Sequence, residues 1–144
     1  MTAKHESAEL ILKLYELRRE ETMRKARDWY IRQFHPQNVQ DIINAWRGEH
    51  SAYYRMVTSY WDMAASFVNH GAIDEQMFGD ANPEHMAVFA KLELFLEELR
   101  SLSGIPNHLQ HLEQLVIRSP GAKERTTQMR ERFKQMAAMR AEAG

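Results

Sequence analysis

Two histidines in the last third of the chain have the spacing of a possible metal site. His108 and His111 lie three residues apart in the segment NHLQHLEQL, and on a helix they would share one face. A bound metal needs at least one further ligand from another segment, and zinc motifs usually show more of their ligands in the sequence. We therefore expect a solvated or helix-end histidine pair, with a metal or proton-transfer site at His108 and His111 as the alternative.

A second group of residues could line a small-molecule pocket. Residues 51–70, SAYYRMVTSYWDMAASFVNH, contain five aromatic side chains, among them Tyr54 and Trp61. At about 100° per residue the aromatics share one arc of about 200° with the aliphatic residues, and Asp62 falls in the opposite, polar arc. This pattern predicts a core wall, in which a site remains only where a Tyr hydroxyl or the Trp61 nitrogen lacks a partner. His85 is the third pocket candidate, although its place in the first turn of a later helix favours a structural role.

Several kinds of chemistry have no motif in this chain. It contains no cysteine, which excludes disulfides, thiolate metal sites and cysteine nucleophiles. It also lacks the Glu-x-x-His repeat of di-iron bundles, a phosphate loop, a nucleophile elbow, an H-E-x-x-H motif and a dinucleotide fingerprint. The sequence therefore predicts no catalytic residues and no cofactor, and it favours a non-enzymatic role.

Proline and glycine divide the chain into segments with helical apolar spacing. His35-Pro36, Gly48, Gly71, Gly104 to Pro106 and Ser119-Pro120-Gly121 are the main breaks, because proline cannot continue a helix and glycine readily ends one. No segment shows the sustained alternation of a strand. The predicted spans, five or six helices and one short helical turn, are 6–34, 38–47, 49–70, 74–78, 83–103, 107–118 and 120–142.

These segments predict an all-α fold. A chain of 144 residues suits one domain over residues 1–144. We expect a bundle of five or six helices with a long N-terminal helix and a peripheral C-terminal helix, and frayed ends at residues 1–6 and 141–144.

The two terminal helices predict contacts at the edge of the bundle. In the first helix the apolar stripe of residues 10–17 is followed by one centred about 100° further round, so a straight helix would meet two surfaces. The last helix has a narrow seam, with a residue of the seam every three or four positions from Ala122 to Arg140. Such a seam suits lateral docking on the first helix or on a second subunit. We therefore predict a homo-oligomer, a dimer through the terminal helices, and allow for another protein partner.

Charge is unevenly distributed along the chain. The net formal charge is −1, made up of +2 in residues 1–35, −6 in residues 36–105 and +3 in residues 106–144. The basic ends mix both signs, which is typical of solvated helix faces. Nucleic-acid binding through Arg18, Arg19, Arg24, Lys25 and the basic last helix is therefore a less favoured alternative. No secretory pattern and no apolar run of about 18 residues is present, so we expect a cytoplasmic protein without a membrane span.

One segment resembles a known group of proteins. Residues 60–78, YWDMAASFVNHGAIDEQMF, combine an aromatic-acid pair, a stop at Gly71 and a cap at Asp74. This pattern is similar to that of uncharacterised all-helical bacterial proteins classed under domains of unknown function. The resemblance implies an all-α bacterial protein and assigns no catalytic residue.

From these observations we expect a helical interaction or structural module that self-associates. A small-molecule- or metal-binding bundle and a nucleic-acid-linked regulator are the two alternatives. The sequence alone does not identify the partner or the ligand.

Overall fold

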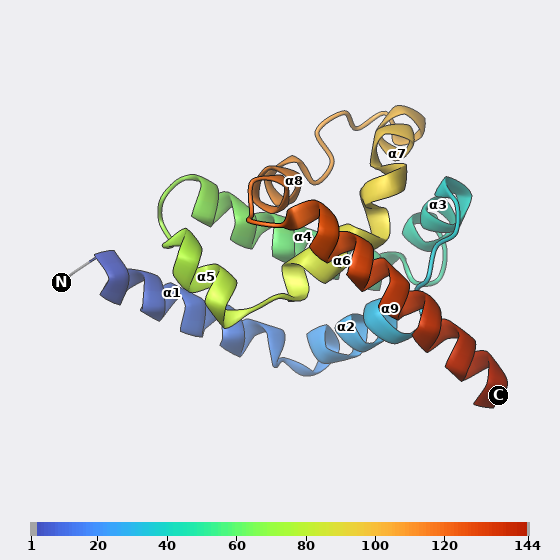
Figure 1. Cartoon of the computed structure of the whole chain (residues 1–144), viewed down its shortest axis with the longest axis horizontal. Coiled ribbons are helices and arrows are strands. Elements are labelled where there is room, and N and C mark those ends of the chain that lie inside the picture. Colours follow the sequence, from blue (N-terminus) through green and yellow to red (C-terminus); the bar gives the residue numbers. More distant parts are fainter. Residues whose placement is uncertain (1–2, 144) are drawn as a thin grey trace.

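The protein is an assembly of helices, as the sequence predicts. The computed structural model describes residues 3–143, in which there are nine α-helices, one 3₁₀ turn and no strand (Figure 1). The elements are α1 Ala3–Arg18, α2 Glu21–Arg32, α3 Val39–Arg47, α4 Ser51–Asn69, α5 Glu75–Ala81, α6 Glu84–Leu92, η1 Glu93–Phe95, α7 Leu96–Ser103, α8 Gln110–Ile117 and α9 Ala122–Ala143. The all-α class is confirmed, and the predicted number of five or six helices is too small.

Helix α4 lies at the centre of the molecule. It packs against α2, α3, α5, α6 and α8, and Tyr54 and Trp61 are each at most 1% exposed. A wide apolar face requires several neighbours, and α4 has them. At its C-terminal end the wall is less complete, because Met63 and Phe67 are 40% and 38% exposed. The predicted core role of residues 51–70 is therefore confirmed for most of the helix.

The predicted single helix over residues 6–34 is wrong, because the chain breaks between α1 and α2. The Glu20 carboxylate accepts hydrogen bonds from the backbone N–H groups of Thr22 (3.0 Å) and Met23 (2.9 Å) and so caps α2. The break lies where the apolar stripe shifts round the helix. The break lets α2 turn its apolar face to the core independently of α1, which buries only Ser7 and Leu14.

The predicted helix over residues 83–103 is also divided, into α6, η1 and α7. At the division the Ala90 carbonyl accepts a hydrogen bond from Arg130 of α9 (3.2 Å), and the same guanidinium pairs with Glu93 at 2.7 Å. A backbone carbonyl near the end of α6 thus finds its partner on another helix.

Helix α9 packs mainly along α6 of the same chain, with a smaller contact to α8. Thr126 is buried in this contact, and farther along Arg140 donates to the Arg32 carbonyl at the end of α2 (3.1 Å). Within the chain, the lateral docking predicted for the last helix is therefore made mainly on α6, with one hydrogen bond to the second half of the predicted first helix.

The ends of the described chain are helical. α1 begins at Ala3 and α9 ends at Ala143. Part of the fraying predicted for residues 1–6 and 141–144 falls on residues 1–2 and 144, which lie outside the described residues. Within residues 3–143 no helix combines the length and the apolar character needed to cross a membrane.

Candidate binding site

Tyr54 and Trp61, two of the predicted pocket residues, use their polar atoms inside the protein. The Tyr54 hydroxyl lies 3.1 Å from His108 Nε2, and Trp61 Nε1 donates to Glu84 Oε2 at 3.2 Å. Burial raises the pKa of the Tyr54 hydroxyl well above its ordinary value, so this group stays protonated. Both rings contribute to the core, and neither offers a polar group to a ligand.

His85, the third pocket candidate, is a buried neutral imidazole. Its residue is 3% exposed, and its ring centroid lies 4.9 Å from that of Phe78 and 6.2 Å from that of Trp61. Nδ1 is buried and has no hydrogen-bond partner among the described residues. Burial lowers the pKa of His85 to about 4, and the charge of Arg125 acts in the same direction. The structure therefore places His85 near Trp61, as a pocket would require, but both side chains are packed in the core and leave no pocket between them.

The predicted metal pair, His108 and His111, is divided between two environments. His108 stacks on Trp46 with ring centroids 4.3 Å apart, and burial, with a contribution from Arg100, lowers its pKa to about 4. The His111 ring lies 6.1 Å from that of His70. Within residues 3–143 no three His, Asp or Glu side chains gather as a metal site would require.

A cluster that the sequence reasoning missed surrounds Glu84 in the first turn of α6. Arg27 of α2 binds the Glu84 carboxylate with two hydrogen bonds of 2.8 Å, and Trp61 adds the third. The side chains of Arg27 and Glu84 are 23% and 18% exposed. The hydrogen bond to Glu84 raises the pKa of Arg27 above its ordinary value, although burial acts against it. The pair is a fork-shaped, partly buried ion pair of the strong kind.

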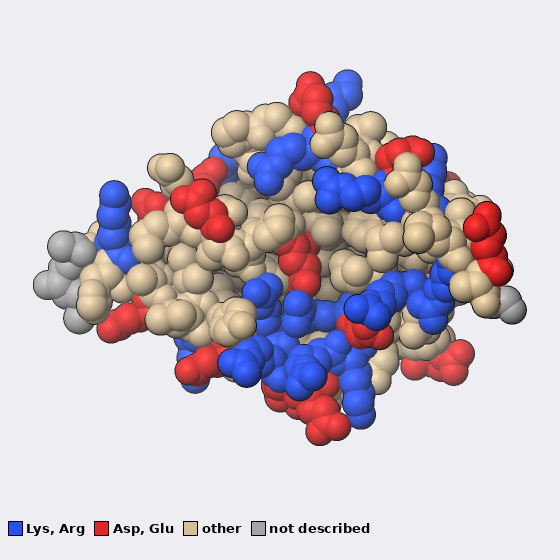
Figure 2. Space-filling view, turned by 60° about the horizontal axis from the view of Figure 1, so that its bottom comes forward, with Lys and Arg blue, Asp and Glu red and all other residues tan. Residues whose placement is uncertain are grey.

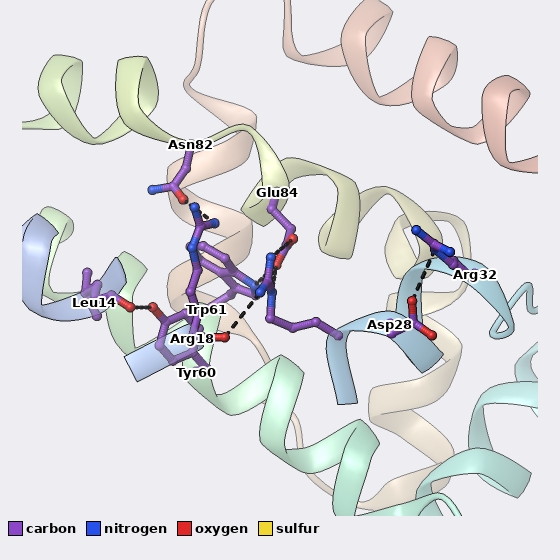
Figure 3. Close-up of polar contacts among 9 residues, drawn as sticks. Leu14, Arg18, Asp28, Arg32, Tyr60, Trp61, Asn82 and Glu84 are labelled. Atoms are coloured by element: carbon purple, nitrogen blue, oxygen red, sulfur yellow. Dashed lines mark hydrogen bonds and ion pairs between the residues drawn. The ribbon is translucent and has the colours of Figure 1, made fainter. Parts of the chain in front are cut away.

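The same cluster ties the end of α1 to the core. Arg27 also donates to the Arg18 carbonyl, the last residue of α1, at 3.2 Å. The Arg18 guanidinium donates to Asn82 Oδ1 at 2.9 Å, and the Tyr60 hydroxyl donates to the Leu14 carbonyl. Figure 3 shows these side chains converging between the helices. Four elements, α1, α2, α4 and α6, are thus fixed around one carboxylate.

Above this cluster runs a groove of about 640 Å³, which we call the arginine groove. Arg18 and Arg27 line one side and Arg125 and Arg132 of α9 the other, with Glu84 as the one carboxylate of the lining. The remaining lining is largely apolar and comes from Pro83, Ala87, Met129, Phe133 and Met136. Figure 2 shows Lys and Arg gathered in a band on the face of the molecule that carries α1, α2 and α9.

Most of the positive charge in the arginine groove has no counter-ion. Glu84 is committed to Arg27, and Arg18 is bonded to a neutral amide. Arg125 and Arg132 are exposed, and their side chains make no ion pair or hydrogen bond to any described residue. The net formal charge of the lining is +3. An apolar floor with three uncompensated guanidiniums can bind an amphipathic anion.

One signal in the sequence could have found half of this groove. Arg125 and Arg132 are seven residues apart, which places them two turns apart on one face of a helix. Nothing local connects them to Arg18 or Glu84, which lie roughly 40 or more residues earlier in the chain.

The fold is that of an all-α protein with a charged groove between its last helix and its first two helices. By comparison with known families, residues 3–119 match a family described as Domain of unknown function (DUF4760), and the chain belongs to this family. The resemblance of residues 60–78 to an all-helical domain of unknown function is thereby confirmed. No curated protein and no solved structure has significant similarity to the chain. The family match ends before α9, which supplies one side of the arginine groove.

Proposed function

We propose that this protein is a non-enzymatic interaction module that binds an acidic, amphipathic segment of a partner protein in the arginine groove. The observation that carries the proposal is the combination of three uncompensated arginines, Arg18, Arg125 and Arg132, with an apolar floor. Guanidinium groups bind carboxylates with two parallel hydrogen bonds. The flexible side chains of Met129 and Met136 suit apolar groups of varied shape.

A protein segment fits the groove better than a nucleic acid does. The Arg27–Glu84 ion pair is neutral overall, so the groove has no even row of positive charge for an evenly charged phosphate backbone. A peptide can place its carboxylates opposite the arginines and an apolar residue near Glu84. Phe133 is the single aromatic ring of the lining, so the groove lacks the row of aromatic platforms on which unpaired bases stack.

The test is a binding titration with a fluorescent amphipathic peptide that alternates Glu and Leu on one helical face. Replacing Arg125 and Arg132 together by Glu should weaken binding by at least about tenfold, since two attractive charges become repulsive. Both side chains are exposed on α9, so the double variant should fold. The matched control replaces Lys123 and Lys134, which lie on the same helix outside the groove, and makes the same change in net charge.

The control variant should keep most of the affinity of the wild-type protein. Equal losses in the two double variants would show a general charge effect and overturn the proposed site. A Lys-Leu peptide should bind weakly. An oligonucleotide that binds tighter than the acidic peptide, with a steep dependence on salt, would replace the partner class by nucleic acid.

A second candidate function is self-association through the terminal helices. Its support is a pair of exposed apolar side chains on one face of α1, Leu12 (63%) and Tyr15 (46%), and the exposed Met139 (67%) in the last turns of α9. Only Ser7 and Leu14 of α1 are buried. Apolar side chains gathered on one helix mark interaction surfaces more often than scattered ones do.

Sedimentation over a range of concentrations tests this second function. The expected result is a dimer that Leu12→Glu and Met139→Glu weaken, while an exposed-loop variant such as Ile105→Glu leaves it intact. Point variants are preferable to removal of α9, because α9 packs on α6 within its own chain. A strict monomer at high micromolar concentration would exclude self-association.

A further inference from the structure

A second cavity lies on the other flank of α9, away from the arginine groove. It is a half-open cavity of about 720 Å³ between α9, the α6–η1 junction and the segment that follows α2. The volume is in the range of small-molecule sites, roughly 300–1,000 Å³. Phe133 lines both the cavity and the groove, and the two are otherwise formed by different residues.

The cavity wall is mainly apolar. Phe95 and Phe133 supply two aromatic rings, and Ala137 and Ala138 leave space between α9 and the η1 turn. Leu94, also part of the lining, is 68% exposed. A ligand with an apolar body would cover this surface.

The charged side chains of the cavity lining are of one sign, and the remaining polar side chains are His35 and Gln37. Lys91, Arg130 and Lys134 line it, and no carboxylate does. Arg130 is paired with Glu93 at 2.7 Å. Lys134 is exposed and its side chain has no partner among the described residues. The cavity therefore has an excess of positive charge beside apolar walls.

Lys91 adds positive charge beside the cavity, but its amino group is already occupied by hydrogen bonds within the protein. It is 5% exposed, and its Nζ donates to the carbonyls of Tyr30 (2.7 Å), Ile31 (3.1 Å) and Phe34 (2.5 Å) at the end of α2. These bonds use all three ammonium protons, so Lys91 is not placed for nucleophilic attack. Burial lowers the pKa of Lys91 to about 7, and an anion nearby would favour its charged form.

We propose that this cavity binds a small organic anion, a monocarboxylate with an apolar body. The apolar body would lie between Phe95, Phe133 and Ala137, and the carboxylate would face Lys134 in the field of Lys91. A single carboxylate matches the one unpaired and accessible cation. A neutral or cationic ligand of the same size would leave that charge unused or would be repelled.

The probe is octanoate, compared with octanol and octylamine of the same chain length. We expect a saturable rise of the melting temperature with octanoate and saturable shifts of amide signals from α9 in NMR spectra. Octanol should bind more weakly and octylamine more weakly still. Lys134→Gln should raise the Kd for octanoate about fivefold, the effect of one exposed charge.

A blocking variant tests the position of the site. Ala138 is exposed on α9, so Ala138→Trp should fold and should abolish octanoate binding by filling the cavity. The matched control is Lys123→Gln, on the same helix outside the cavity, which should bind as the wild-type protein does. Equal binding of octanoate and octanol would overturn the anion class. No saturation up to about 10 mM, or unchanged octanoate binding by Ala138→Trp, would overturn the site.

Discussion

Acid should destabilise this protein through His85, because the fold buries this histidine as a neutral ring. His85 is 3% exposed, and its pKa is lowered from 6.5 to about 4 by burial. Since the pKa in the folded state lies below that of the unfolded state, the unfolded chain takes up a proton first as the pH falls. The stabilising contribution is complete above pH ~6.5 and is lost progressively as the pH falls through 6.5 toward about 4.

The size of the effect follows from the two pKa values. Between pH ~8 and ~5 the linkage relation gives a loss of about 2 kcal/mol in the free energy of unfolding from His85 alone. The pKa of His108 is also lowered to about 4, so His108 lowers the free energy of unfolding further over the same pH range. The wild-type protein should therefore lose more than the His85 contribution.

The perturbation is His85→Leu, which keeps nearly the same volume beside Phe78 and Trp61. The variant also removes Nδ1, a buried nitrogen without a hydrogen-bond partner among the described residues, so stability at pH ~8 should be unchanged or higher. Between pH ~8 and ~5 it should lose about 2 kcal/mol less than the wild-type protein.

Urea unfolding followed by circular dichroism measures both quantities. The control is His70→Gln at an exposed position, which leaves His85 and His108 in place. If His85→Leu shows the same loss as the wild-type protein, the buried neutral His85 does not account for the acid sensitivity, and the argument from burial fails.

Three further substitutions should lower the free energy of unfolding in the same assay. Glu84→Gln leaves the Arg27 guanidinium without its counter-ion and should cost about 2 kcal/mol, and no change would mean that the pair is screened by solvent. Asp62→Ala removes the acceptor of the Leu112 N–H (2.9 Å) at the start of α8 and should cost about 1 kcal/mol, while Asp62→Asn should keep most of the stability. Gly104→Ala should cost about 1 kcal/mol from backbone strain alone, because φ is +74° and a Cβ would meet nothing within 4 Å; a neutral result would contradict that conformation.

Some of the site could be predicted because its signals are local. The aromatic residues of α4 were expected in a core wall, and Tyr54 and Trp61 are there. The periodicity of a helix is set by its own residues, so a sequence shows which of its faces is apolar. The same local reasoning could not assign Asp62. It lies in the polar arc of α4, as expected, but its carboxylate caps α8, which comes about 50 residues later.

The features that form the candidate sites were not local. A lysine within a helix is normally solvated, yet Lys91 is buried because three carbonyls at the end of α2 surround its Nζ. The metal hypothesis rested on the spacing of His108 and His111. In the structure His108 stacks on Trp46, whereas the His111 ring lies beside that of His70. Neither neighbour could be named before the helices were placed.

The sequence by itself determined the all-α class, the positions of most breaks and the central role of residues 51–70, since proline, glycine and apolar periodicity act over a few residues. Tertiary structure alone decided the arginine groove and the cationic cavity beside Phe133. The physical reason is that burial and charge compensation depend on which distant side chains meet. Arg18 and Arg132, at opposite ends of the chain, face one groove only because α9 folds back along α6.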